Sequence, residues 1–217
     1  MKKSIFLSFI LCLCLVACIP QQVMAQKQSR MEKLLRYLND NDADKWQKNR
    51  EKLDDETKAY YAEDLSLMDV LNDLWNGQSE QAATLYFGCY EKAAQNNFPS
   101  ICEGEKIPLS QIRDKADQSI INLLEASKDK IPFSRALLDS IHATEYPVDS
   151  AMLQRLQNIR EVALLEGMLK APTPIIYQTY VKEYPNGKFI AQVNASENVR
   201  LYQLVKTTPT PANFKAF

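Results

Sequence analysis

The sequence predicts an all-α fold of stacked antiparallel helix hairpins, and three observations lead to this. Glycine is scarce, at 5 of 217 residues, whereas strand-rich folds usually need frequent glycine-containing turns. Most of the ten prolines lie at the borders of apolar-periodic segments, where proline starts or stops a helix. The stretch 172–180 returns at 209–217 with a spacing of 37, and Glu-Tyr-Pro at 145–147 returns at 183–185 with a spacing of 38. Such self-similarity is typical of helix pairs that bury their apolar faces by stacking.

The chain begins with a predicted signal peptide, residues 1–25. Lys2 and Lys3 precede an apolar run over 5–17, which is too short to span a bilayer but suits the core of a secretory signal. In the interpretation we favour, cleavage follows Val23-Met24-Ala25, because the polar, proline-containing segment before Ala25 is typical of a cleavage region.

A second interpretation of the same segment stays open. Leu15-Val16-Ala17-Cys18 resembles the lipobox of bacterial lipoproteins, which would place diacylglycerol on Cys18. Both interpretations predict export, to the periplasm or to an outer-membrane anchor. No later segment is long and apolar enough to cross a membrane, so contact with the membrane is expected only through such a lipid.

The mature chain has a nearly balanced charge. Without Lys2 and Lys3, 24 basic residues face 27 acidic ones. No cluster of Lys and Arg stands out from this background, so nucleic acid is not an expected partner.

Residues 26–130 are predicted to form an N-terminal helical region. Apolar residues at helical spacing predict helices over 29–38, 43–53, 57–75, 79–94 and 109–128, with an irregular segment over 95–108. Ser29 is a candidate N-cap for the first helix, and Asn76-Gly77 is a stop signal. Alanines beside tyrosines along 79–94 favour close antiparallel packing.

Residues 131–217 are predicted to form helical repeats, each with a short helix followed by a long one. The expected helices cover 133–144, 150–170, 173–184 and 188–205. Thr173 can cap its helix with Pro174 in the first helical position, and Thr210-Pro211 offers the same arrangement. The last repeat is apparently incomplete. Either the chain is a fragment of a longer protein, or its last turn docks on the preceding helix as a cap.

Two cysteines, Cys89 and Cys102, remain outside the signal. In an oxidising compartment, two cysteines 13 positions apart across a loop predict a disulfide. The alternative is that Cys89 is a small apolar residue packed on its helix.

No residue set in the sequence predicts a catalytic site, a metal site or a cofactor. Asp40, Asp42 and Asp44 with Glu51 resemble a calcium loop, but Lys45 replaces the required glycine. Helix capping explains these acidic residues better. The only histidine, His142, is expected to be a partly buried structural residue, which excludes multi-histidine zinc sites.

The run Tyr177-x-x-Tyr180-x-x-x-Tyr184-Pro185-Asn186-Gly187-Lys188 resembles the tetratricopeptide-type repeats of bacterial outer-membrane and periplasmic proteins. Those repeats pair an aromatic-rich first helix with a Tyr-Pro turn. The resemblance covers about 85 residues from Phe133 onward. The period departs from the 34 residues of the standard repeat, and the Trp-x-x-Leu-Gly signature is missing. The resemblance implies a tetratricopeptide-like α-solenoid that acts as a non-catalytic scaffold or adaptor for a protein partner in the envelope.

A second function stays open beside the scaffold. Tyr177, Tyr180 and Tyr184 could form an aromatic surface for a partner, a carbohydrate or a peptide. Packing between successive repeats would explain the same three tyrosines.

Overall fold

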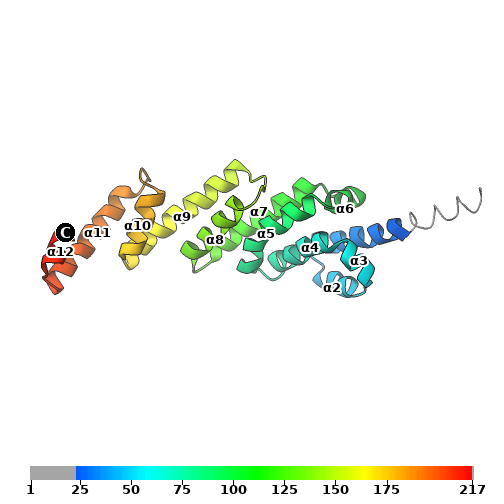
Figure 1. The fold of residues 1–217 in the computed structure, drawn as a ribbon, viewed down its shortest axis with the longest axis horizontal. Coiled ribbons are helices and arrows are strands. Elements are labelled where there is room, and N and C mark those ends of the chain that lie inside the picture. The colour runs from blue at the N-terminus through cyan, green and yellow to red at the C-terminus, as the bar shows by residue number, and fades with distance from the viewer. Residues whose placement is uncertain (1–22, 217) are drawn as a thin grey trace, which may run out of the picture. The chain divides into compact units, whose positions relative to one another are not determined.

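The computed structural model describes residues 23–216, and every regular element in that range is a helix. The all-α prediction is confirmed (Figure 1). The chain forms two compact units. The first extends to Ile120 and includes Thr144–Tyr146, and the second comprises Ile121–Ala143 and the chain from Pro147 onward. None of the helices in the described range combines the length and the hydropathy that a membrane span requires.

The first helix covers 23–39 within the described residues. Ser29 lies in its interior, so the prediction that Ser29 caps this helix is wrong. Four side chains at helical spacing face the core and are fully buried: Met31, Leu34, Leu35 and Leu38. The lipidation predicted at Cys18 and most of the predicted signal lie outside the described residues, whereas the segment 23–25 lies within this helix.

The predicted helix over 57–75 is two helices, α3 (Asp55–Tyr60) and α4 (Ala62–Trp75). Tyr61 separates them, with φ −105° and ψ 30°. Its ring is buried, whereas the neighbouring Tyr60 is 47% exposed. Both helices keep the same apolar period, which is why the break is invisible in the sequence.

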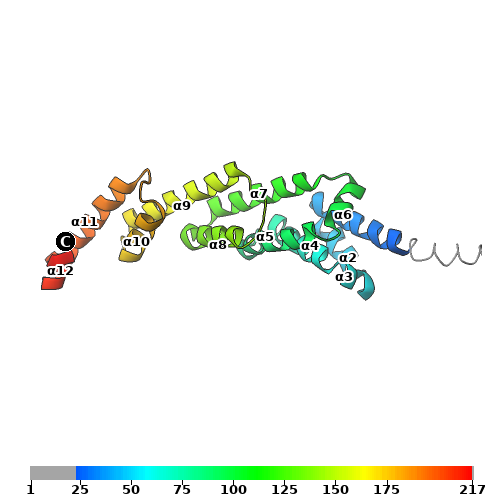
Figure 2. The same ribbon diagram turned by 45° about the horizontal axis from the view of Figure 1, so that its top comes forward.

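Three other helices follow the predicted ranges closely. They are α2 (Ala43–Glu51), α5 (Glu80–Ala94) and α7 (Leu109–Ala126). α4 and α5 pack side by side (Figure 2). Ala82, Ala83 and Ala93 on α5 are almost fully buried, and their small side chains permit this close approach.

The irregular segment predicted over 95–108 contains a helix, α6 (Phe98–Glu105). Pro99 sits in its first turn, where a missing N–H is tolerated, so this proline begins a helix and does not exclude one. Lys106 ends the helix in the left-handed conformation, with φ 58°. Phe98, Ile101 and Cys102 anchor α6 in the core.

The second unit alternates short and long helices, as predicted. They are α8 (Lys130–His142), α9 (Ser150–Lys170), α10 (Pro174–Glu183), α11 (Ile190–Thr207) and α12 (Pro211–Ala216). Thr173 caps α10 by accepting a hydrogen bond from Ile176 N (3.3 Å). Thr210 accepts in the same way from Asn213 N (3.2 Å) at the start of α12. α8 begins earlier than predicted, with Pro132 in its first turn.

α9, α10 and α11 share one core, and Figures 1 and 2 show α10 lying against α9 and α11. The buried residues of this core are Leu164, Leu165, Met168, Tyr180 and Val193. They come from three different helices, which therefore pack around a common core.

Candidate functional site

The three tyrosines 177, 180 and 184 serve mainly as packing residues. Tyr180 is fully buried. Its hydroxyl donates to Glu161 Oε1 (2.8 Å) and accepts from Phe189 N (3.1 Å). Tyr177 and Tyr184 are half-buried against the same core. A surface for a ligand or a partner that needs Tyr180 is therefore not supported, because no part of that side chain reaches solvent.

Burial also shapes the acidity of these phenols. It raises the pKa of Tyr180 to about 12, and the hydrogen bond to Glu161 adds to that shift. Burial likewise raises the pKa of Tyr184 to about 12. Both phenols therefore stay protonated at neutral pH and act as hydrogen-bond donors.

A buried arginine holds the end of α10. Arg160 of α9 is 2% exposed. Its guanidinium forms a bidentate pair with Glu183, with Nε–Oε2 2.6 Å and Nη2–Oε1 2.9 Å. Nη1 donates to Ile131 O (2.7 Å) and to Ser134 Oγ (3.1 Å) of α8. One side chain thus ties three helices together.

The earlier Glu-Tyr-Pro motif is anchored by its tyrosine. Tyr146 donates to Asp117 Oδ1 (2.6 Å) and lies 3.3 Å from the hydroxyl of Tyr86. Its ring packs edge-on against Tyr86, Phe87 and Tyr90 of α5. Burial raises the pKa of Tyr146 far above its usual range. The tyrosine of each Glu-Tyr-Pro motif is thus held by packing and by a hydrogen bond from its hydroxyl.

One helix face in the second unit is poorly covered. We define the α11 face as Leu201, Tyr202 and Val205 of α11 together with Phe214 of α12. Tyr202 is 53% exposed and Phe214 is 60% exposed. Leu201 and Val205 are half-buried. Exposed apolar side chains are typical of an interaction site where they form a contiguous patch.

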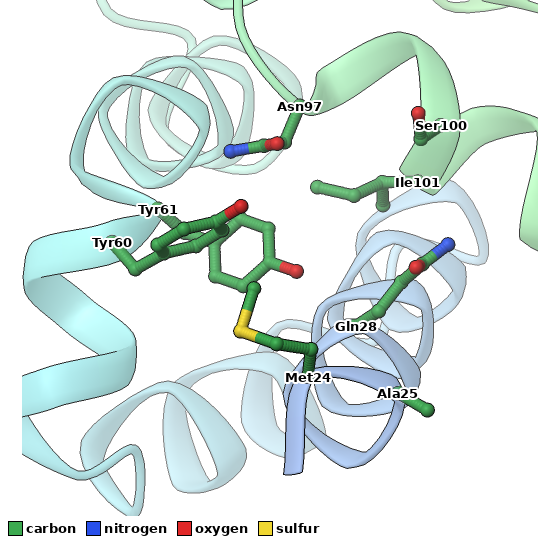
Figure 3. A pocket seen from close by; sticks show the side chains of 8 residues that line it. All are labelled: Met24, Ala25, Gln28, Tyr60, Tyr61, Asn97, Ser100 and Ile101. Carbon is green, nitrogen blue, oxygen red and sulfur yellow. The ribbon is translucent and has the colours of Figure 1, made fainter. Parts of the chain in front are cut away.

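A cavity of about 430 Å³ lies in the first unit, and we call it the tyrosine pocket. Figure 3 shows its eight lining residues: Met24, Ala25, Gln28, Tyr60, Tyr61, Asn97, Ser100 and Ile101. No charged side chain is among them. The hydroxyls of Tyr60 and Tyr61 both point into the space between the first helix and α6 (Figure 3). Sequence reasoning missed this pocket because it assigned 57–75 to one helix and 95–108 to a loop.

The two cysteines are free thiols, so the predicted disulfide is not formed in this structure. Cys89 Sγ lies 3.5 Å from Ser66 Oγ of α4. Cys102 is buried. Burial raises the pKa of the Cys102 thiol to about 12.

The acidic cluster at 40–44 has a structural role. Asp42 caps α2 by accepting from Lys45 N (3.1 Å). The hydrogen bonds from Lys45 lower the pKa of Asp42. The capping interpretation is confirmed for this residue. Across 23–216, no group of three or more His, Cys, Asp and Glu side chains is placed to hold a metal ion.

His142 lies in the last turn of α8 and is exposed. The prediction that it is partly buried is wrong, because the apolar face of α8 is formed by Phe133, Leu137 and Ile141.

Comparisons with protein-family models, with curated proteins and with solved structures found no match to this chain.

Proposed function

We propose that this protein is a non-catalytic, tetratricopeptide-like scaffold or adaptor of the bacterial cell envelope that binds a protein partner. The observation that carries the proposal is the α11 face, where two aromatic side chains are more than half exposed beside two half-buried aliphatic ones. Aromatic residues in a cluster of this kind are the usual anchors of protein interfaces. The predicted signal peptide supports the location.

Affinity capture from envelope extracts tests this proposal. We expect the wild-type chain to recover a reproducible partner that is lost when Tyr202→Glu and Phe214→Glu are introduced together. Leu85→Glu is the matched control, because Leu85 is an exposed apolar residue of α5 (50% exposed) in the other unit. Circular dichroism checks that the variants keep their helices. A partner that both variants retain would argue against the α11 face.

The tyrosine pocket favours a second function, the binding of a small neutral ligand such as a carbohydrate or a short peptide. Met24 and Ala25 belong to the predicted signal peptide, so after cleavage the other six lining residues form the pocket. Tyr61 is buried, and its hydroxyl points into the pocket. Amide and hydroxyl groups from Gln28, Asn97 and Ser100 add donors and acceptors. Ligand-induced thermal shifts with a panel of neutral oligosaccharides and peptides test this function. A shift that Tyr61→Phe abolishes would support it.

A further inference from the structure

The α11 face repeats a surface that is covered elsewhere in the same unit. At the 37-residue spacing, Leu201, Tyr202 and Val205 correspond to Leu164, Leu165 and Met168 of α9. Those α9 residues are buried, at 0%, 8% and 0% exposure. Equivalent positions on two successive long helices are therefore buried in α9 but only partly buried in α11, although α12 packs against α11.

Both α10 and α11 cover this part of α9, with Tyr180 from α10 and Val193 from α11 in the shared core, and the α11 side shows which residues fit such a face. Val193 of α11 is buried in the shared core, and Phe189 and Ile190 pack against it. α11 thus presents an aromatic residue followed by aliphatic residues one and four positions later. This spacing places the two aliphatic side chains on one side of a helix. A helix with the same pattern would continue the established α9–α11 packing on the α11 face.

The charged residues near the α11 face indicate which charged residues a bound helix should carry. Between 198 and 216 the sequence contains Arg200, Lys206 and Lys215 and no carboxylate. Arg200 is paired with Glu197 (Nη2–Oε1 2.6 Å). Lys206 and Lys215 are exposed. Two lysines beside an apolar surface attract an acidic partner.

We propose that the α11 face binds an amphipathic helix of a partner protein, with an aromatic-aliphatic-x-x-aliphatic stripe flanked by acidic residues. This inference rests on the proposed scaffold function and names the chemistry of the partner. An anionic membrane would also attract lysines and aromatic residues. The helix is favoured because helices of the same unit cover the equivalent α9 surface and because Leu201 and Val205 are half-buried, whereas a membrane contacts protruding side chains.

Binding of labelled peptides to the full chain, followed by fluorescence anisotropy, tests the proposal. The acidic probe is the 186–207 segment carrying Lys188→Glu and Lys206→Glu, and a second probe keeps the native lysines. A third probe is the acidic one with Ile190→Asp and Val193→Asp, which break the stripe. We expect the acidic probe to bind about tenfold more tightly than the native probe at low salt, and this advantage to shrink at high salt. The broken probe is expected not to bind.

Variants of the full chain then locate the site. Lys206→Glu with Lys215→Glu should abolish the preference for the acidic probe, whereas Lys92→Glu, an exposed lysine of α5, should leave it unchanged. Equal binding of the first two probes, no binding by either, or binding of the chain to phosphatidylglycerol vesicles through these lysines would overturn the proposal. Affinity capture could still depend on Tyr202 and Phe214 while none of the peptide probes binds. That result would support the scaffold function and contradict only the proposal that the partner is a helix.

Discussion

Asp64 is a buried carboxylate on α4, and its environment makes the charged form unfavourable. Its exposed fraction is zero. Oδ2 accepts one hydrogen bond, from Asn96 Nδ2 (3.1 Å), and Oδ1 has none. Burial raises the pKa of Asp64 to about 6, although polar groups around Asn97 and Phe98 oppose this shift. A buried, half-satisfied carboxylate destabilises the fold when it is ionised.

This shift predicts that stability rises as the pH falls from about 6 toward 4. In that window the folded protein binds the proton and the unfolded chain does not, so the free energy of unfolding decreases as pH increases. Over this whole pH window, the titration of Asp64 changes the free energy of unfolding by an amount on the order of 3 kcal/mol. We expect Asp64→Asn to be more stable than wild type at pH 7.5 by about 2 kcal/mol and to lose this part of the pH dependence. Urea denaturation at pH 5 and 7.5 measures both.

Asp114→Asn is the matched control for this prediction. Asp114 is exposed on α7, so its substitution should leave the pH dependence close to that of wild type. If Asp64→Asn and wild type showed the same pH dependence, the assignment of the shift to Asp64 would be wrong.

Gly187 lies in the turn between α10 and α11, where a larger residue has no room. An added Cβ would lie 2.6 Å from Tyr180 Oη and 2.9 Å from Tyr184 Cβ, and against Glu161 Oε1. Gly187→Ala should therefore lower the free energy of unfolding by about 1–3 kcal/mol, the usual range for overpacking. Chemical denaturation followed by circular dichroism measures the loss.

Gly88 provides the opposite case within the same chain. It lies in α5, and an added Cβ would meet nothing within 4 Å. Gly88→Ala should raise stability by about 0.5–1 kcal/mol through helix propensity.

A stable Gly187→Ala variant would mean that the turn can open without loss of the Tyr180 hydrogen bonds.

At the scale of elements, Arg160 links α8, α9 and α10. Burial raises the pKa of Glu183, but hydrogen bonds and charge from Arg160 and Arg135 outweigh it, so its pKa lies below the usual value. Arg160→Ala would leave Glu183 without its main partner and should destabilise the unit by about 3–5 kcal/mol. Arg160→Met, which fills the same space, should cost less. Thermal denaturation followed by circular dichroism measures both.

Arg135 tests whether burial is what makes this ion pair strong. It contacts the same carboxylate (Nη1–Oε1 3.2 Å), but its side chain is 56% exposed. Exposed pairs usually contribute less than about 1 kcal/mol, so Arg135→Ala should have a small effect. Equal losses of stability in Arg160→Ala and Arg135→Ala would argue against a special role for the buried arginine.

The helices could be predicted where period, cap and proline agree. α9 has its predicted bounds, and Thr173-Pro174 marks the start of α10. α6 was missed because Pro99 and Gly104 mimic a loop, whereas buried Phe98 and Ile101 fix the segment as a helix. Arg160, Tyr61 and the α11 face were missed because their roles depend on residues distant in the chain, which no local pattern reveals.

The two units of the whole molecule can be followed separately, because both tryptophans lie in the first. Trp46 and Trp75 belong to α2 and α4, so fluorescence reports on that unit alone, whereas circular dichroism reports on all helices. Arg160→Ala should shift the unfolding transition seen by circular dichroism to a lower urea concentration. The midpoint of the tryptophan fluorescence transition should stay unchanged. Urea titration with both signals measures this.

Phe98→Ala is the reciprocal variant in the first unit. Phe98 is fully buried in α6, and its truncation should destabilise that unit by about 3–5 kcal/mol and shift the fluorescence midpoint. Both midpoints moving together in both variants would mean that the chain unfolds as one cooperative body. That outcome would be explained by α7, since this continuous helix runs from the first unit into the second beyond Ile120. Separate midpoints would instead mean that a single helix is too little to couple two hydrophobic cores.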